Sequence, residues 1–238
     1  MKSDQLCGNR AGGLCHPFNH AVLSEPVYAY EAISSETEGR FQSRGSKFIA
    51  YAFPMDSLEM LEKRIAQLKS EHPKARHHCY GYRILSDNGI REYSSDDGEP
   101  SGSAGKPILS AIKSAELLNV GCVVVRYFGG TKLGIPGLIE AYKESTRDAL
   151  GLAIIRTVKR TKVYRLSMPM ALQPHMLNAC KKMDLDVSGL EYSTDFQLDV
   201  HVPLLDEEKT VLGLFRMLSG RDYTMIEEYM KFLNLELL

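Results

Sequence analysis

The sequence lacks a long apolar run and an excess of either charge. No stretch approaches the roughly 18 consecutive apolar residues of a membrane span, and the first residues, MKSDQLCGNRAGG, contain no apolar core of a signal peptide. We therefore expect a cytoplasmic protein without membrane contacts. Because 29 Lys and Arg residues nearly balance 30 Asp and Glu residues, the surface as a whole offers no electrostatic reason to bind nucleic acid, and any site for a polyanion must be local.

Cysteine is scarce and shows no pairing pattern. Five cysteines are an odd number in a chain without a secretory signal, so we expect free thiols rather than a disulfide framework. Near the start, Cys7, Cys15, His16 and His20 have side chains that can bind zinc, but no CxxC pair accompanies them. We expect no metal and no cofactor. Residues 1–27 show neither helical nor strand periodicity, which predicts a flexible extension.

The middle of the chain is predicted to mix strands and helices. Residues 47–53 and 120–128 are rich in β-branched and aromatic side chains, which is typical of strands, and the second run is apolar enough for the centre of a sheet. Apolar residues at helical spacing predict a helix over residues 58–68, with Asp56 in its N-terminal cap. Asn88-Gly89 supplies the turn of a predicted hairpin.

A second domain follows once the glycine-rich composition ends. Residues 158–238 are predicted to adopt the ferredoxin-like order βαββαβ, with strands over 161–168, 185–192, 196–202 and from 223 onward, and helices over 173–183 and 206–218. The polar segment TVKRTK marks the boundary with the first domain, residues 28–157. Acidic residues slightly outnumber basic ones in the second domain, which makes it a poor candidate for electrostatic RNA binding.

Two glycine-rich polar loops each follow a predicted strand and lead into a predicted helix. The first is SSDDGEPSGSAGKP, residues 94–107, and the second is GGTKLGIPG, residues 129–137. Pro107 and Pro136 suit the first turn of the helices that follow. The first N–H groups of a helix have no partner within the helix and attract anions. Since both loops belong to the same α/β layer, we expect them to converge on one face of the first domain.

The candidate binding residues come from these two loops and the strand between them. Arg126, Lys106 and Lys132 lie beside glycines that let a ligand approach the backbone, as expected of a contact to phosphate or to an RNA backbone. The alternative is that the glycines only permit tight turns. The candidates are Asp96, Asp97, Glu99, Ser101, Ser103, Lys106, Arg126, Gly129, Gly130, Thr131, Lys132 and Gly134.

The carboxylates of the first loop allow two interpretations. Asp96, Asp97 and Glu99 are oxygen ligands of the kind that hold Mg²⁺ together with substrate phosphates. They can also cap helix starts and accept hydrogen bonds from loop N–H groups, which is the interpretation we favour. His77 or His78 could join a metal site, because adjacent strand residues face opposite sides of a sheet. An inward histidine can equally be an ordinary core residue.

Four aromatic residues are candidate platforms for nucleic-acid bases. Tyr80 and Tyr82 share one face of a predicted strand, and Tyr127 and Phe128 end another. For at least two of them we expect core packing instead.

Three segments, in this order and spacing, carry a resemblance to a known family. HPKARHHCYGYRI, SDDGEPSGSAGKPIL and VVVRYFGGTKLGIPGLIEAY resemble the YigZ/Impact family over roughly residues 40–150. The chain departs from the family pattern LGxGGL at Pro136, which removes one N–H donor, and at Glu140, where a basic residue is common.

The resemblance implies an α+β protein of two domains. The first would have the left-handed βαβ fold of the second domain of a small-subunit ribosomal protein, and the second would be ferredoxin-like, as in bacterial members. Eukaryotic members restrain a starvation-responsive kinase and so affect translation initiation. Bacterial members have been described as nucleic-acid-binding or translation-related proteins without an assigned reaction.

We therefore expect a translation-linked regulatory or binding protein that contacts RNA or a ribosome-associated partner through the two loops. The alternative is a metal-assisted phosphoryl-transfer or hydrolytic enzyme that acts on a phosphate-containing small molecule or nucleic acid. The binding protein is the preferred interpretation, because no pair of nucleophile and base can be identified in the sequence.

Overall fold

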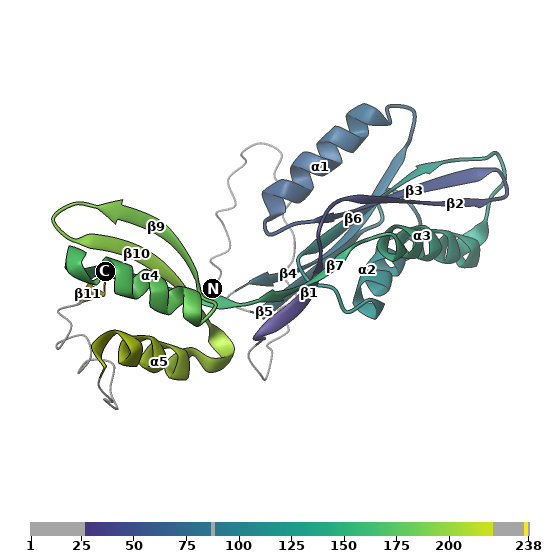
Figure 1. Ribbon diagram of the computed structural model, residues 1–238. Helices are drawn as coiled ribbons and strands as arrows, with labels where there is room; N and C mark the ends of the chain where they lie inside the picture. The colour runs from purple at the N-terminus through teal and green to yellow at the C-terminus, as the bar shows by residue number, and fades with distance from the viewer. Residues whose placement is uncertain (1–26, 87–88, 221–235, 238) are drawn as a thin grey trace, which may run out of the picture. The chain divides into compact units, whose positions relative to one another are not determined.

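The computed structural model describes residues 27–86, 89–220 and 236–237, which divide into two compact units (Figure 1). The first unit contains residues 31–156, and the second contains residues 27–30 together with the described residues from 157 onward. Residues 1–26 of the predicted N-terminal extension, with its four candidate zinc ligands, lie outside the described residues.

An antiparallel sheet of five strands forms the centre of the first unit. The strands lie in the order β2-β3-β6-β4-β5, with the bounds Thr37–Ser43 (β2), Ser46–Pro54 (β3), His77–Ser86 (β4), Gly89–Ser95 (β5) and Val120–Tyr127 (β6). Because β6 is antiparallel to both of its neighbours, β3 and β4 run parallel on either side of it. Pairing of Ser86 with Gly89 confirms the predicted hairpin, although Gly89 is the first residue of β5 and not part of the turn. A separate two-stranded sheet joins β1 (Ala29–Ile33) to β7 (Ile155–Lys159).

Three helices cover the two faces of the five-stranded sheet. Helix α1 (Leu58–Glu71) connects the parallel strands β3 and β4 and packs on one face, whereas α2 (Gly105–Ser114) and α3 (Gly134–Gly151) pack on the other (Figure 1). With both faces covered, β6 is buried from residue 120 to 126, as its apolar composition predicts. The predicted cap of α1 is wrong: the N-cap residue is Ser57, not Asp56, and its side chain makes no capping hydrogen bond.

The alternation of side chains along the strands divides the core into two layers. Toward α1, strand residues Tyr80, Tyr82, Val123 and Val125 pack with Leu61, Ile65 and Leu68. On the opposite face, Phe48 and Val124 pack with Ile108, Ile112, Leu138 and Tyr142. Each large buried apolar side chain contributes roughly 1.5–3 kcal/mol, so the two layers hold the strand ends, and the loops that leave them, in defined positions.

The second unit has the ferredoxin-like topology that its sequence predicts. Its sheet has the strand order β11-β8-β10-β9, and its elements are β8 (Thr161–Met168), α4 (Gln173–Lys182), β9 (Asp186–Tyr192), β10 (Phe196–Pro203), α5 (Glu207–Ser219) and β11 (Glu236–Leu237). Most of the predicted last strand lies outside the described residues. The α+β class with a ferredoxin-like second domain is therefore confirmed. In the part of the chain that the structure describes, no helix is long and apolar enough to cross a membrane.

Candidate binding site at the glycine-rich loops

Asp96 holds the first glycine-rich loop in its folded shape. Its carboxylate accepts hydrogen bonds from the backbone N–H groups of Gly102, Ala104 and Gly105, at 2.7, 3.0 and 2.9 Å. Two of these groups belong to the start of α2, so the side chain caps the helix as we expected. Gly105 must be glycine, since an added Cβ would lie 2.7 Å from the backbone nitrogen of Ser95. Asp96 therefore has a structural role that occupies both of its oxygens.

Asp97 ties the same loop to the start of β4. Its Oδ2 accepts a hydrogen bond from the backbone N–H of His78 at 2.7 Å, and its carbonyl oxygen lies 2.9 Å from Nδ1 of His77. Ser103 is buried and donates to the carbonyl of Pro100 at 2.6 Å, whereas Ser101 is exposed. The capping interpretation is thus confirmed for Asp96, whereas Asp97 accepts from a strand N–H group and Glu99 pairs with Arg126, so neither of them caps a helix. Across the described residues, no group of three His, Cys, Asp or Glu side chains is placed to hold a metal ion.

Glu99 of the first loop and Arg126 of β6 form a buried ion pair. Nη1 of Arg126 lies 2.5 Å from Oε1 of Glu99, and the side chains are only 8% and 4% exposed. Tyr142 of α3 donates its hydroxyl to the same carboxylate oxygen at 2.8 Å. Burial, reinforced by Cys79 and Glu99, raises the pKa of the Tyr142 hydroxyl far above its ordinary value, so it stays protonated and remains a donor.

The Arg126 guanidinium also lies between two aromatic rings. It is 5.5 Å from the centroid of Phe48 and 5.6 Å from that of Phe128. The candidate arginine is therefore a neutralised part of the floor of the site rather than an exposed phosphate ligand. The sequence did not point to Tyr142 as part of this site, because a tyrosine at an apolar position of a predicted helix is ordinarily a core residue.

The second loop is shaped by close packing at Gly129. A Cβ at this position would lie 1.9 Å from the carbonyl carbon of Gly45, so only glycine fits. Gly130 and Gly134 have positive φ angles of +88° and +74°, which glycine adopts without strain. The three candidate glycines therefore agree with the interpretation that glycine permits tight turns here. Thr131 and Lys132 are exposed.

Both loops border one pocket, which confirms the predicted convergence. It has a volume of about 360 Å³ and is lined by Glu99, Pro100, Arg126, Phe128, Lys132, Leu133, Gly134, Ile135 and Leu138. Phe128 and Ile135 at its rim are 59% and 54% exposed. Four of the candidate residues line it, namely Glu99, Arg126, Lys132 and Gly134; Lys106 is exposed on the first turn of α2. We refer to this feature as the loop pocket.

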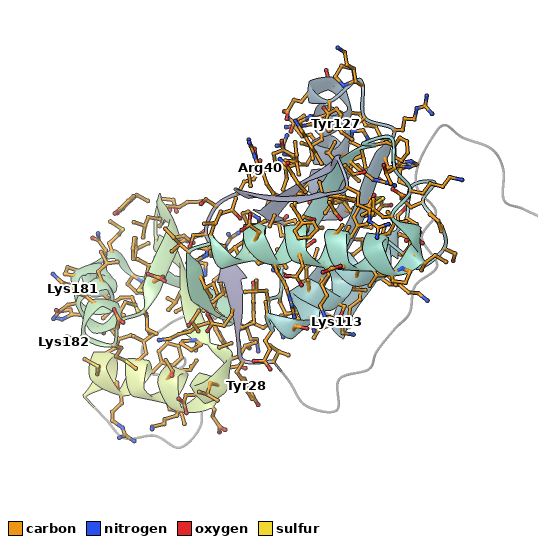
Figure 2. The ribbon with its side chains drawn as sticks, turned by 90° about the vertical axis from the view of Figure 1, so that its right-hand side faces the viewer. Tyr28, Arg40, Lys113, Tyr127, Lys181 and Lys182 are labelled. Atoms are coloured by element: carbon orange, nitrogen blue, oxygen red, sulfur yellow. The ribbon has the colours of Figure 1, made fainter. Side chains whose placement is uncertain are left out.

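The aromatic and histidine candidates divide between core and surface. Tyr80 and Tyr82 are 5% and 2% exposed under α1, which confirms core packing for two of the four rings. Burial lowers the pKa of His78 below its usual value, so this histidine favours the neutral form. Tyr127 is partly exposed, on the side of the sheet that carries Arg40 (Figure 2). Tyr127 and Phe128 thus remain available to a ligand.

Comparison with known proteins supports the resemblance seen in the motifs. The Impact N-terminal domain family matches residues 44–150. An IMPACT family member of Haemophilus influenzae is 35% identical over 167 residues, which cover 70% of this chain and 79% of the relative. The IMPACT family member YigZ of Escherichia coli is 38% identical over 153 residues, or 64% of this chain and 73% of the relative.

A solved structure shares the fold across both units. The crystal structure of a protein described as hypothetical covers 90% of this chain and 98% of its own, with a TM-score of 0.62 and 24% identity.

Proposed function

Because the chain belongs to the IMPACT family, we propose that it is a translation-linked regulatory protein that acts in the cytoplasm. We further propose that the loop pocket is its contact site for a ribosome-associated protein. Translation-linked regulation is what the sequence motifs imply for this family, and the loop pocket is the place in the first unit where both motif loops meet.

We choose a protein partner because the lining of the pocket is mostly apolar and the arginine at its base is paired with a carboxylate. Pro100, Phe128, Leu133, Ile135 and Leu138 supply the walls and rim, while the charge of Arg126 is matched by Glu99. Of the two cations that line the pocket, Arg126 is paired with Glu99 and Lys132 is exposed, whereas binding of an RNA backbone usually requires several unpaired cations. Interfaces between proteins, in contrast, are dominated by a few apolar or aromatic anchors that fill such pockets.

The floor of the pocket is suited to recognition because it cannot easily rearrange. Both charged side chains are buried and hydrogen-bonded to each other, and Tyr142 donates a hydrogen bond to Glu99. A site that is rigid before binding loses less conformational entropy when a partner docks. We propose that an apolar side chain of the partner enters the pocket, and that Lys132 at its edge pairs with a neighbouring carboxylate of the partner.

The alternative of a metal-assisted enzyme has no comparable support. The Asp96 oxygens and Oδ2 of Asp97 accept hydrogen bonds from backbone N–H groups. A divalent cation would have to break the bonds that shape the loop. The proposal therefore does not extend to catalysis.

Cosedimentation with ribosomes tests the proposal. Ribosomes prepared at low salt retain their associated proteins, and salt-washed ribosomes serve as the comparison. Wild-type protein is expected to sediment with the former and much less with the latter. Ile135→Asp should weaken this binding at least about tenfold, because a charge would enter the apolar rim.

Matched controls lie on the second unit. Leu205→Asp changes a side chain that is 66% exposed and is the control for Ile135→Asp. Lys132→Ala should also weaken ribosome binding, because it removes the cation proposed to pair with a carboxylate of the partner. Its control is Lys181→Ala, at the exposed lysine labelled in Figure 2. Both controls should sediment like the wild type. Equal sedimentation of Ile135→Asp and wild type, or no ribosome binding by the wild type, would overturn the proposal.

A further inference from the structure

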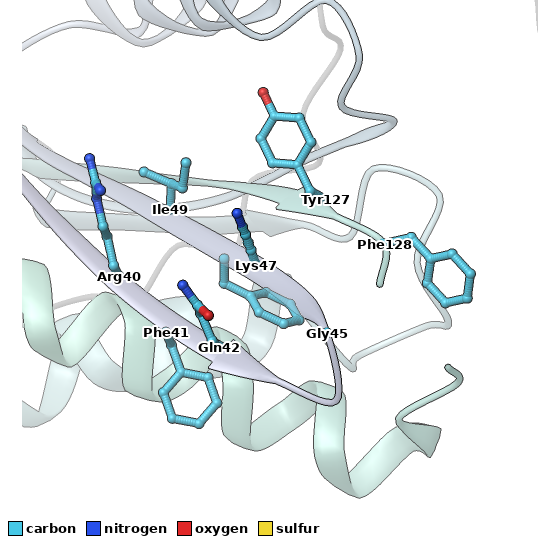
Figure 3. Close-up of a pocket in the computed structure, with 9 residues that line it drawn as sticks. Arg40, Phe41, Gln42, Gly45, Lys47, Ile49, Tyr127 and Phe128 are labelled. Carbon is cyan, nitrogen blue, oxygen red and sulfur yellow. The ribbon is translucent and has the colours of Figure 1, made fainter. Parts of the chain in front are cut away.

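A second cavity lies on the exposed part of the five-stranded sheet, at the ends of β2, β3 and β6 (Figure 3). It has a volume of about 460 Å³ and is lined by Arg40, Phe41, Gln42, Gly45, Lys47, Phe48, Ile49, Tyr127 and Phe128. We call it the sheet groove. We infer that the sheet groove binds single-stranded RNA, with bases stacked on Tyr127 and Phe128 and phosphates held by Arg40 and Lys47.

Strand register explains why these side chains form one surface. Gln42 pairs with Lys47 across β2 and β3, and Lys47 pairs with Tyr127 across β3 and β6. These three side chains therefore form a row across the sheet, and the pair Arg40 and Ile49 forms the next row on the same face. Figure 3 shows Arg40, Lys47, Ile49 and Tyr127 projecting from this face, while Phe41 projects from the other.

The charge of the groove is complementary to a polyanion. Arg40 and Lys47 are both exposed, and Arg44 is exposed at the turn between β2 and β3. Among the described residues that line the groove there is no carboxylate. Arg40 does contact Glu38 beside the groove, but its side chain is 72% exposed, and such a surface pair is weak enough to be replaced by a phosphate. This differs from the loop pocket, where a buried carboxylate neutralises the arginine.

The two aromatic rings are held in place before any ligand arrives. The hydroxyl of Tyr127 lies 2.8 Å from Nδ1 of His72, whose Nε2 is 2.9 Å from the hydroxyl of Tyr51. Phe128 lies against the Arg126 guanidinium and is still 59% exposed. Single-stranded nucleic acids bind to such combinations of cationic grooves and stacking rings, since every base offers a π face.

We infer nucleic-acid binding from the side chains of the sheet groove alone. The choice of RNA over DNA depends in addition on the translation-linked role proposed above. Fluorescence anisotropy of a labelled oligouridine, titrated with the full-length protein at several salt concentrations, tests both. Phe128→Ala should weaken binding by roughly 5- to 150-fold, the range found for loss of one stacked base. Arg40→Ala combined with Lys47→Ala should flatten the salt dependence by about 0.7 per lost phosphate contact.

Because Phe128 lines both the sheet groove and the loop pocket, the control variants change residues that border only one of these sites or neither of them. Ile135→Asp, which should weaken ribosome association, is expected to bind oligouridine like the wild type, as is Lys181→Ala. Tyr127→Phe keeps the stacking ring and loses only its hydrogen bond to His72, so it should weaken binding less than Phe128→Ala does. Thermal melts of each variant check that it is folded.

Three results would overturn the inference. The first is no wild-type binding up to about 100 μM protein at low salt. The second is an unchanged affinity and salt slope in the Arg40 and Lys47 double variant. The third is equal binding of polyglutamate, because a simple polyanion site needs no aromatic rings. Equal affinity for oligothymidine would overturn the choice of RNA.

Discussion

Replacing Glu99 by leucine should destabilise the first unit strongly, although the residue lies in a polar loop. The substitution leaves the Arg126 guanidinium, 8% exposed, without its carboxylate partner. It also removes the acceptor of the Tyr142 hydroxyl. A buried charge that loses its partner costs about 3–5 kcal/mol, because the interior cannot replace the lost solvation.

A double substitution separates the ion pair from simple loss of packing. Arg126→Met alone leaves the buried Glu99 carboxylate without its cation and should lower the free energy of unfolding by a similar amount. Glu99→Leu together with Arg126→Met leaves no buried charge, so its cost should fall to roughly the 1–3 kcal/mol of an unsatisfied Tyr142 hydroxyl. The double variant is therefore expected to be more stable than either single variant, and the difference measures the coupling.

Hydrogen exchange of the β6 amides is the suitable assay, because it reports opening of the first unit independently of the second. The matched control is Arg147→Leu, which removes a surface pair with Glu144 whose side chains are 51% and 39% exposed and should cost less than about 1 kcal/mol. If Glu99→Leu cost no more than this control, or if the two single costs simply added, the description of a coupled buried pair would be refuted.

Three further predictions concern stability. Burial lowers the pKa of His78 below its ordinary value of 6.5, so its contribution to the free energy of unfolding is present above that pH and is lost as the pH falls below it. His78→Phe should flatten this pH dependence in urea unfolding between pH 7 and pH 5. Gly129→Ala should cost more than about 2 kcal/mol, because its Cβ would lie 1.9 Å from a backbone atom, whereas Gly151→Ala, with nothing within 4 Å, should be close to neutral in the same assay. Asp96→Ala should lower the thermal midpoint, since about 1–2 kcal/mol is typical for loss of a cap alone, while the exposed Ser101→Ala should leave it unchanged.

Local patterns were sufficient for many elements of the fold, but not for the strands β1, β2 and β7, which the sequence did not predict. The apolar run of β6, the helical spacing from Leu58 to Leu68 and the turn before β5 each depend on residues close together in the chain. The ferredoxin-like order of the second unit followed from the same kind of pattern. The N-cap residue of α1 could not be predicted in this way, because Asp56 and Ser57 are both good capping residues and only the backbone geometry selects one.

The sequence alone determined the family, the two-domain organisation it implies and the two loops that approach each other, since motifs and periodicity are properties of neighbouring residues. Only the tertiary structure decided what each charged residue does. Arg126 looks like a phosphate ligand until the fold brings Glu99, 27 positions away, to its guanidinium. No sequence motif marks Arg40 and Lys47 as binding residues, and only the strand register places them beside Tyr127. Pairing across strands and between loops depends on packing of the whole sheet, which no short segment specifies by itself.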